Sequence, residues 1–507
     1  MYMFGVRAFN DEPKPTKLTP RDFTFTHRLP TLHDSCHQLR ILEKEARTPS
    51  ATSKAVSPTC PGRPSSNEVL PAEILTEIFT LCLTELPEEH NSLDTTCCPW
   101  NLGQVCHSWR VIVTRHAPHL WTHLYLDLEA MGYDPPRVCR QQQILQEAIT
   151  RGHDRPLDLE INARDCHMLA YDCVLWALLR HAHRWRCVDI MLPDCTGPWD
   201  MISVTFPLLE WFSVEGSEAS ESGGGRIDLT AAPKLVGLRI EMLPIGMDLR
   251  VPWEQLRTFE DSDSYASYEP LFVRLSRCRD LEELTIIADK AFFEDTPPPF
   301  TYTLPNLRKL DVSATLDEDF PCGILSALTA PRLESLAVTY WTEEQLQDFI
   351  TETIKLLKRS SVPTLTSLDL SGPPAVAFSD DRMRVFLRDI PKLTSFTATG
   401  TFDKDFFDLL IEPKSEGLRE FKFLPHLTEL TLHAAEESND AGIMDLLWAR
   451  SLRPTTPRQN RLKSIEIWYV DKAWYDDDRV VLDERSQLVI ACKGGELCYS
   501  SWCPFVL

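Results

Sequence analysis

The sequence predicts an α/β protein in which a small all-helical module precedes a curved, irregular solenoid with a parallel sheet. One short leucine-containing phrase recurs at intervals of 21 to 35 residues between residues 207 and 467. Apolar residues at helical spacing lie before these repeats, within residues 68–124. A single repeat of this size cannot bury its own apolar edge, so a recurring phrase predicts stacked units that share one core.

The composition is that of a soluble globular chain: 507 residues, 43% hydrophobic and 25% charged. With 52 Lys and Arg against 75 Asp and Glu, the net charge is −23. Such a surface repels phosphate and anionic lipid, so we expect neither nucleic acid nor membrane as a partner. The longest apolar run covers about seven residues, against roughly 20 for a membrane span. No secretory signal is apparent, so we expect a cytoplasmic and/or nuclear protein with reduced thiols.

Residues 1–67 are predicted to be mostly disordered. Their last third is rich in Ser and Thr and carries prolines at 49, 58, 61 and 64. Such a composition buries too little apolar surface to offset the entropy lost on ordering. We interpret this part as a flexible linker; phosphorylation at Ser57-Pro58 is an alternative that the plain linker outweighs.

Residues 68–124 are predicted to contain two or three short helices. Pro71 suits a first helical position, and an apolar stripe follows: Ile74, Leu75, Ile78, Phe79 and Cys82. A second stripe comprises Leu102, Val105, Cys106, Trp109, Ile112 and Val113, before Pro118, Leu120 and Trp121. About 55 residues in crossed helices cannot cover all of these side chains. Some are therefore expected to serve a partner or the following domain.

These residues resemble the F-box-like domain of fungal, especially mushroom-type, F-box proteins. The family pattern is matched by three motifs in order: Leu70, Pro71, Glu73, Ile74 and Leu75; Val105, Cys106, Trp109 and Arg110; and Pro118, Leu120 and Trp121. The match covers about 11% of the chain, and an acidic insertion between the first two helices departs from the family.

The resemblance implies a three-helix module that docks on a Skp-type adaptor and so joins a cullin-based ubiquitin ligase. Carried over residue by residue, it assigns the adaptor contact to Leu70, Pro71, Ile74, Leu75, Val105, Cys106 and Trp109. For each of these positions the alternative is ordinary core packing.

The repeated phrase is Pro-x-Leu-x-x-Leu-x-Leu. It occurs at 207–214, 233–240, 279–286, 305–312, 331–338, 363–370, 391–398, 425–432 and 461–467, with a poorer copy at 254–259. Proline stands two places before the first leucine in seven of the ten copies, although only 37 of 507 residues are proline. The last two leucines alternate, which predicts a short strand that points both into the core.

These phrases resemble leucine-rich repeats, although the usual Asn or Cys is replaced by Thr315 and Trp341 in two copies. We assign residues 185–470 to degenerate repeats, residues 125–184 to a helical bridge and residues 471–507 to a C-terminal cap. A helix is predicted over 341–359, with Thr342 as cap, Glu343 and Glu344 in its first turn, a buried face of Leu346, Phe349, Ile350 and Leu357, and Lys355, Lys358 and Arg359 near its end.

No sequence motif indicates catalysis, a metal site or a cofactor. Gly223 to Gly225 lack the Lys-Ser/Thr of a phosphate loop, and Asp476 to Asp478 lack the spaced ligands of a calcium loop. We therefore predict a protein that is not an enzyme. A hydrolase is a remote alternative, because the members of a catalytic triad need not be close in sequence.

The predicted function is that of a substrate receptor in a cullin-type ubiquitin ligase. Its alternative is a ligase-independent repeat scaffold in which the helical module caps the open end of the solenoid. In either case the target protein is unknown. Candidate target contacts are the solvent-pointing residues between the strand leucines: Arg239, Thr285, Asp311, Ala337, Asp369 and Thr431.

Overall fold

The computed structural model describes two compact units, Met1–Glu88 and Glu89–Leu507. The predicted linker (1–67) lies outside the described residues. These are 70–84, 90–129, 134–164, 166–193, 204–216, 225–243, 247–262, 268–288, 301–314, 320–339, 342–360, 365–373, 376, 378, 381–414, 421–435, 440–452, 462–470, 487–493 and 496–499.

In the first unit, the described residues form one helix, α2 (Ala72–Thr84). The amide of Leu75 donates to the Pro71 carbonyl at 3.1 Å, so Pro71 stands at the helix start, as predicted. Glu73 lies in the first turn, where the partial positive charge of the helix end favours an anion.

The second unit is built on one long sheet, in which 13 consecutive strands are parallel. In sheet order they are β1 (His123–Asp127), β2 (Leu157–Asn162), β3 (Trp185–Met191), β4 (Trp211–Glu215), β6 (Gly237–Glu241), β8 (Thr258–Ser262), β9 (Glu283–Ala288), β11 (Lys309–Ala314), β13 (Ser335–Thr339), β14 (Ser367–Ser371), β15 (Ser395–Gly400), β16 (Glu429–Ala435) and β17 (Ser464–Val470). Two antiparallel strands, β18 (Gln487–Lys493) and β19 (Glu496–Tyr499), follow.

All ten copies of the leucine phrase lead into strands of this sheet, from β4 to β17. The predicted alternation and parallel sheet are therefore confirmed. The frequent proline also has a structural reason. In Ala330-Pro331-Arg332-Leu333, the Leu333 amide donates to the Ala330 carbonyl at 3.2 Å. Proline thus occupies the second position of a tight turn, where its fixed φ is favourable.

The sheet starts earlier than the repeated phrase predicts. Residues 125–184 contain the two expected helices, α5 (Pro135–Arg151) and α6 (Met168–Leu179), but also most of β1 and all of β2. Neither strand carries the proline phrase; β2 alternates buried and half-exposed residues, whereas Leu124, Tyr125 and Leu126 of β1 are all buried. The segment therefore forms β–α–β repeats that continue the same sheet.

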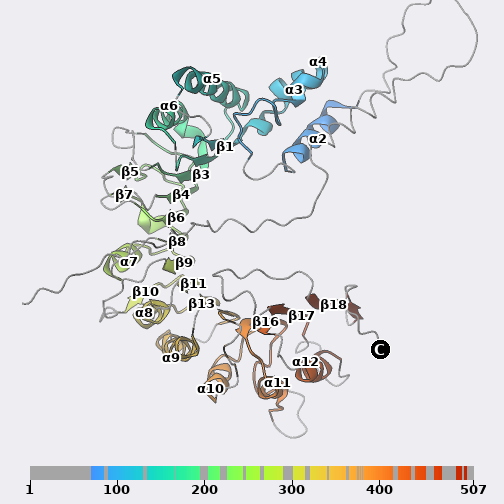
Figure 1. The fold of residues 1–507 in the computed structure, drawn as a ribbon. Coiled ribbons are helices and arrows are strands. Elements are labelled where there is room, and N and C mark those ends of the chain that lie inside the picture. Colours follow the sequence, from blue (N-terminus) through green and yellow to red (C-terminus); the bar gives the residue numbers. More distant parts are fainter. Residues whose placement is uncertain are drawn as a thin grey trace, which may run out of the picture. The chain divides into compact units, whose positions relative to one another are not determined.

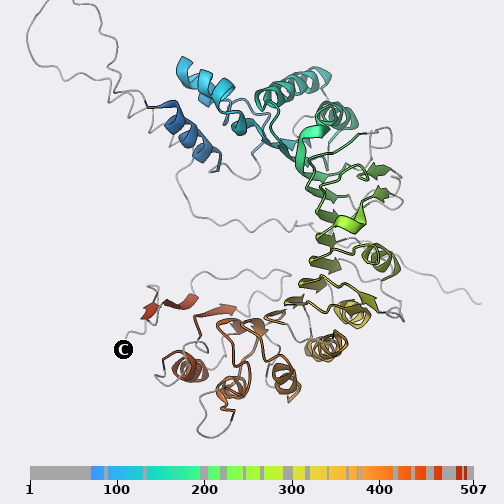
Figure 2. The same cartoon turned by 180° about the vertical axis from the view of Figure 1, so that it is seen from behind.

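Helices lie along one face of the sheet, on the outer side of its curve (Figure 1), and the view from behind agrees (Figure 2). After α6 they are α7 (Tyr268–Leu275), α8 (Phe320–Ala327), α9 (Glu343–Arg359), α10 (Asp381–Asp389), α11 (Lys404–Ile411) and α12 (Asp440–Leu447), with short turns η4 (Ala182–Arg184), η6 (Trp253–Gln255) and η7 (Trp448–Leu452). Two small parallel pairs complete the unit: β5 (Arg226–Asp228) with β7 (Asp248–Arg250), and β10 (Tyr302–Thr303) with β12 (Leu328–Thr329).

The core lies between the helices and the sheet face that they cover. Equivalent strand positions stack in register, and one stack runs Leu124, Leu159, Val188, Phe212, Leu238, Phe259, Leu284, Leu310, Leu336, Leu368, Phe396, Leu430 and Ile465, all of them buried. The neighbouring stack is equally apolar except at β8, where Asp261 is fully buried and pairs with Arg274 of α7.

Candidate interaction surfaces

Helix α2 has two apolar faces. At 100° per residue, Leu75 and Phe79 lie on one side, and Ile74 lies on another with Leu81. Leu75 is only 5% exposed and Phe79 is buried, whereas Ile74 is 48% exposed and Leu70, just before the helix, is 52% exposed. Of the four predicted adaptor contacts here, Leu70, Pro71 and Ile74 are therefore exposed, and Leu75 is buried.

The second group of predicted adaptor contacts belongs to the second unit. The sequence predicts one helix through these residues, but the structure has α3 (Leu102–Val105) and α4 (His107–Val111) separated by Cys106 in an extended conformation. The Cys106 Sγ accepts from the Trp109 amide at 3.5 Å and so caps α4. Val105 is 43% exposed, Cys106 is exposed and Trp109 is half-buried.

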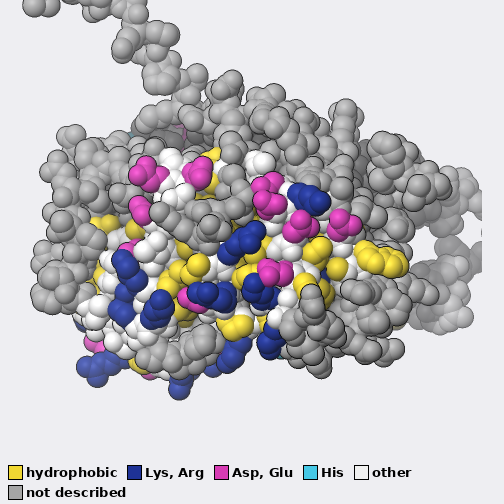
Figure 3. Space-filling model, turned by 90° about the horizontal axis from the view of Figure 1, so that it is seen from below, with side chains coloured by type: hydrophobic (Ala, Val, Ile, Leu, Met, Phe, Trp, Pro, Cys, Tyr) yellow, Lys and Arg dark blue, Asp and Glu magenta, His cyan; other side chains and the backbone are white. Residues whose placement is uncertain are grey.

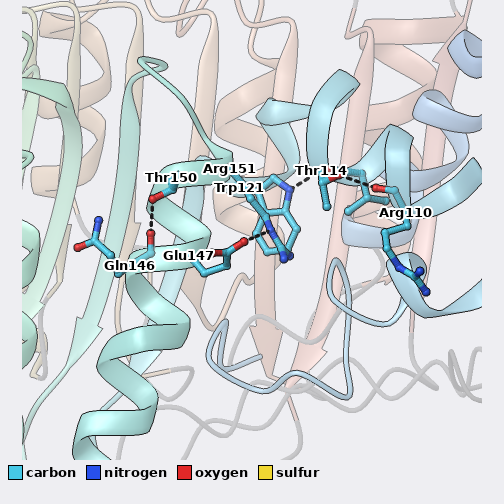
Figure 4. Close-up of polar contacts among 8 residues, drawn as sticks. Arg110, Thr114, Trp121, Gln146, Glu147, Thr150 and Arg151 are labelled. Carbon is cyan, nitrogen blue, oxygen red and sulfur yellow. Dashed lines mark hydrogen bonds and ion pairs between the residues drawn. The ribbon is translucent and has the colours of Figure 1, made fainter. Parts of the chain in front are cut away.

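The remainder of this helical segment is built into the start of the sheet unit. It continues through a π-helical turn, η1 (Ile112–His116), and a 3-10 turn, η2 (Pro118–Trp121). The buried Trp121 donates from its indole Nε1 to the Val113 carbonyl at 2.9 Å. Its ring lies edge-on to Trp100 with centroids 4.6 Å apart, and the Arg151 guanidinium of α5 stacks on both rings. Figure 4 shows how α5 presents Arg151 to Trp121, with Glu147 holding the guanidinium at 3.0 Å.

Residues 91 and 92, within the insertion, bind the free edge of β1, the first strand of the sheet. The Ser92 amide donates to the Tyr125 carbonyl of β1 at 2.8 Å, and the Tyr125 amide donates to the Ser92 Oγ at 3.0 Å. The Asn91 side chain donates to the Asp127 carbonyl at 2.9 Å. An edge strand exposes unpaired amides and carbonyls, which template aggregation. These two residues therefore act as a cap for β1.

The six candidate target contacts lie in a single row on the sheet face opposite the helices, which we call the open face. In strand register this central row reads Tyr125, Glu160, Asp189, Ser213, Arg239, Glu260, Thr285, Asp311, Ala337, Asp369, Thr397, Thr431 and Glu466. All six candidates are half-buried. The structure thus aligns them, and it adds acidic neighbours that the sequence analysis missed, notably Glu260 and Glu466.

Acidic side chains dominate the open face, but they are compensated unevenly. From β2 to β11, basic side chains pair with them: Arg186 with Asp158, Arg164 with Glu215, Arg239 with Glu241, and Lys309 with Glu283. From β13 to β17, no Lys or Arg occupies a described position of the central row or of the two rows beside it.

Several basic residues described in the C-terminal half lie on its helices. Exposed examples are Lys355, Lys358, Arg384, Arg388 and Lys404. Figure 3 views the chain from below Figure 1, on the side of α9 to α12, and shows Lys and Arg side chains there together with Asp and Glu side chains. The helix side of this half therefore carries both signs of charge, whereas the described open-face rows from β13 to β17 carry no Lys or Arg.

Burial shifts the pKa of several groups on the open face. It raises the pKa of Asp311, and the charge of Asp369 raises it further against a hydrogen bond from Ser313. Burial also raises the pKa of Glu260, which the Arg239 charge opposes. Burial lowers the pKa of His433, which Asp369 and Glu466 oppose. Like charges and partial desolvation thus raise the free energy of the folded protein as long as no partner covers the open face.

Among the described residues, no group of three or more His, Cys, Asp or Glu is arranged to hold a metal ion. Within the same residues, no helix is both long enough and apolar enough to cross a membrane. The described residues thus present exposed apolar side chains on and just before α2 and an acidic sheet face on the second unit. No protein-family model matches this chain, and no curated protein matches it either.

Proposed function

We propose that this chain is a substrate receptor of a cullin-type ubiquitin ligase. In this proposal the apolar residues around α2 bind a Skp-type adaptor, and the open face of the sheet binds the target protein. The observation that carries it is the exposure of Leu70 and Ile74, about half of each side chain, on a helix whose other apolar face is buried.

Exposed apolar side chains of this kind favour a partner. Covering the exposed halves of Leu70 and Ile74 contributes roughly 1 kcal/mol each. Pro71 is also exposed beside them, and Val105 of the second unit is exposed as well. A helix that presents an apolar face to a hydrophobic groove is a recurrent mode of protein recognition. The motif resemblance names the groove as that of a Skp-type adaptor.

The open face supplies the second half of the proposal. Repeat proteins commonly bind partners through a continuous strand face, because equivalent side chains stand in rows. Here one row places Asp311, Ala337 and Asp369 side by side on adjacent strands. A flat row of half-buried polar side chains is suited to protein recognition and offers no catalytic constellation among the described residues.

The test is a pull-down of the full chain with a purified Skp-type adaptor. Wild-type protein should bind, and Leu70→Asp/Ile74→Asp should weaken binding by about tenfold or more, because each carboxylate must be desolvated in an apolar interface. The matched control is Val273→Asp/Val385→Asp, which adds the same charges at two exposed valines of α7 and α10. Unchanged adaptor binding by a folded Leu70→Asp/Ile74→Asp protein would refute the proposal.

A second candidate function is a ligase-independent repeat scaffold. It is favoured by the way residues 91–121 are built into the sheet unit, through Ser92 on β1 and through Trp100 against Trp121 and Arg151. In this case the helical segment serves only as an end cap. Wild-type chain would then fail to bind the adaptor, and deletion of residues 68–124 would destabilise the repeats.

A further inference from the structure

In the C-terminal half of the open face, strands β13 to β15 form a floor of small side chains, and larger residues stand on either side of it, Lys309 on β11 and Glu429 and His433 on β16. One flanking row contains Ser335, Ser367 and Ser395, and the other contains Ser313, Thr339, Ser371 and Thr399. In the central row, Ala337 lies between Asp311 and Asp369. Helices α5 to α12 lie on the opposite face (Figure 2). Long side chains of a partner can therefore approach the strands closely here.

Asp311 and Asp369 are oriented by their own strands. The Ser313 hydroxyl donates to Asp311 Oδ1 at 3.2 Å, and the Ser371 hydroxyl donates to Asp369 Oδ1 at 2.8 Å. Thr339, between them, donates to the Ser313 hydroxyl at 3.3 Å. The same Asp-x-Ser arrangement thus occurs on both sides of Ala337. Two strand spacings separate the carboxylates by roughly 10 Å, so a cation above Ala337 would lie within reach of both.

Within the described part of the chain, no Lys or Arg side chain pairs with these two carboxylates, and Asp369 interacts electrostatically with His433. Among the described residues, neither Asp311 nor Asp369 forms an ion pair, in contrast to Glu283, whose carboxylate contacts Lys309 at 2.7 Å. Glu429 and Glu466 continue the negative charge on β16 and β17. Charge complementarity therefore requires a positively charged partner and excludes nucleic acid and anionic lipid.

We infer that the open face from β11 to β17 binds a Lys- or Arg-rich segment of another protein, with a basic side chain seated over Ala337 between Asp311 and Asp369. The inference deepens the proposed function, because it names the chemistry of the target and rests on the open face as the target surface. A lysine or arginine stem would pack on the Ala337 methyl group while its charge reaches both carboxylates.

The test measures binding of a fluorescent 15-residue peptide of alternating Arg, Lys and Ser to the full chain by anisotropy. A peptide with Glu in place of Arg and Lys is the negative control. Wild-type chain should bind the basic peptide, and more weakly as salt shortens the Debye length. Asp311→Asn/Asp369→Asn should weaken binding about tenfold, because two ion pairs of modest strength are lost.

The matched control is Asp348→Asn/Asp408→Asn, which removes two exposed carboxylates from α9 and α11 on the helix side. It makes the same change in net charge and should alter affinity less than about twofold at physiological salt. Equal weakening in the two double variants would show attraction by net charge alone and would overturn the inference. Absence of peptide binding by wild-type chain would do the same.

Adaptor pull-down with the same protein preparations separates this inference from the proposed function. If the basic peptide fails to bind while the adaptor is retained, the target chemistry is wrong and the receptor proposal stands. If the adaptor is lost while the peptide binds through Asp311 and Asp369, the ligase proposal falls and the acidic binding surface remains. Unfolding temperatures of all variants establish that each protein is folded.

Discussion

At the scale of single residues, three arginines join neighbouring repeats. Each donates a hydrogen bond to a backbone carbonyl in the last turn of a preceding helix or just beyond it, where helical carbonyls lack partners, and Arg450 also reaches two carbonyls in the turn before β16. The contacts are Arg184 to Ile149 and Arg155, Arg359 to Leu325 and Leu328, and Arg450 to Leu410, Phe423 and Leu424. A long planar guanidinium suits this role because it offers several donors in a fixed geometry.

Arg450 is the most completely buried of the three. Its guanidinium makes four hydrogen bonds of 2.6 to 2.8 Å to carbonyls and lies 4.1 Å from the centre of the Phe421 ring. Burial lowers its pKa to about 9, so the group is still charged at neutral pH. Neighbouring carbonyl dipoles and an aromatic ring stabilise the charge, and no ion pair to Arg450 is formed within the described residues.

We predict that Arg450→Met destabilises the chain by roughly 3 kcal/mol or more, because three buried carbonyls lose charge-assisted partners. Arg450→Lys should recover only part of this loss, because a single ammonium cannot reproduce the fork of donors. Urea unfolding measures both. Arg388→Met, at an exposed arginine of α10, is the control and should change stability by less than about 0.5 kcal/mol. Equal stability of Arg450→Met and wild type would contradict a stabilising role of the Arg450 hydrogen bonds.

At the scale of elements, α9 combines nearly all the signals that define a helix. Thr342 and Gln345 form a reciprocal capping box: the Thr342 hydroxyl accepts from the Gln345 amide at 3.1 Å, and the Gln345 side chain accepts from the Thr342 amide at 3.2 Å. The predicted cap and buried face are confirmed. The predicted role of Arg359 at the helix end is extended, because its side chain also reaches the preceding repeat.

We predict that Thr342→Ala destabilises the chain by about 1 kcal/mol through loss of this cap. Thr351→Ala is the matched control in the same helix: Thr351 is exposed, and its hydroxyl bonds only to the Gln347 carbonyl one turn earlier. Removing that hydroxyl should be nearly neutral, since alanine has the better helix propensity. Chemical unfolding of both variants tests the difference; similar losses would mean that capping does not stabilise α9.

The segment from Leu102 to Val113 shows why a periodic pattern can mislead about one element. Its apolar spacing fits one helix, yet the helix is interrupted at Cys106, whose sulfur caps α4. Cysteine is a weak acceptor and is not a usual cap residue, so sequence alone favours an uninterrupted helix. The break leaves Leu102, Ile112 and Val113 buried and Val105 exposed.

At the scale of the whole second unit, the two faces of the sheet serve different purposes. The helix-covered face stacks equivalent apolar residues strand after strand, and this core carries the stability. The open face brings like charges together, which lowers the stability of the fold, since burial and the charge of Asp369 both raise the pKa of Asp311. Residues that cost stability without a structural return are typical of binding surfaces.

We predict that Asp311→Asn makes the chain more stable than wild type at pH 7 and that this gain shrinks as the pH falls towards 3.8. The pKa of Asp311 is higher in the folded chain than its ordinary value of 3.8, so the folded state binds this proton more tightly than the unfolded state does. This contribution to stability is fully present below pH 3.8 and is lost as the pH rises through the pKa of the folded state. Asparagine is neutral throughout and retains an oxygen that can accept from Ser313.

Urea midpoints at pH 7 and at pH 3.8 measure this effect, with Asp408→Asn on the exposed side of α11 as control. Asp408→Asn should leave the pH dependence unchanged. A gain from Asp311→Asn that is the same at both pH values would show that charge at this position does not cost stability.

The sequence determined the local and repeating features of this protein. The spacing of leucines and prolines is enough to locate ten strands and their turns, because each repeat obeys the same local rule of alternation. It also located α2 and α9, and it placed Arg239, Asp311 and Asp369 on strand positions that point away from the core.

Only the tertiary structure decided which distant residues become neighbours. Strand register brings Asp311 and Asp369 to either side of Ala337, although 58 positions separate them in the chain. It also places Ser92 on the edge of β1, Arg450 under the carbonyls of Leu410 and Phe423, and Asp261 inside an otherwise apolar stack. Periodicity is a local property, whereas register, edge capping and compensation of charge depend on how whole repeats stack.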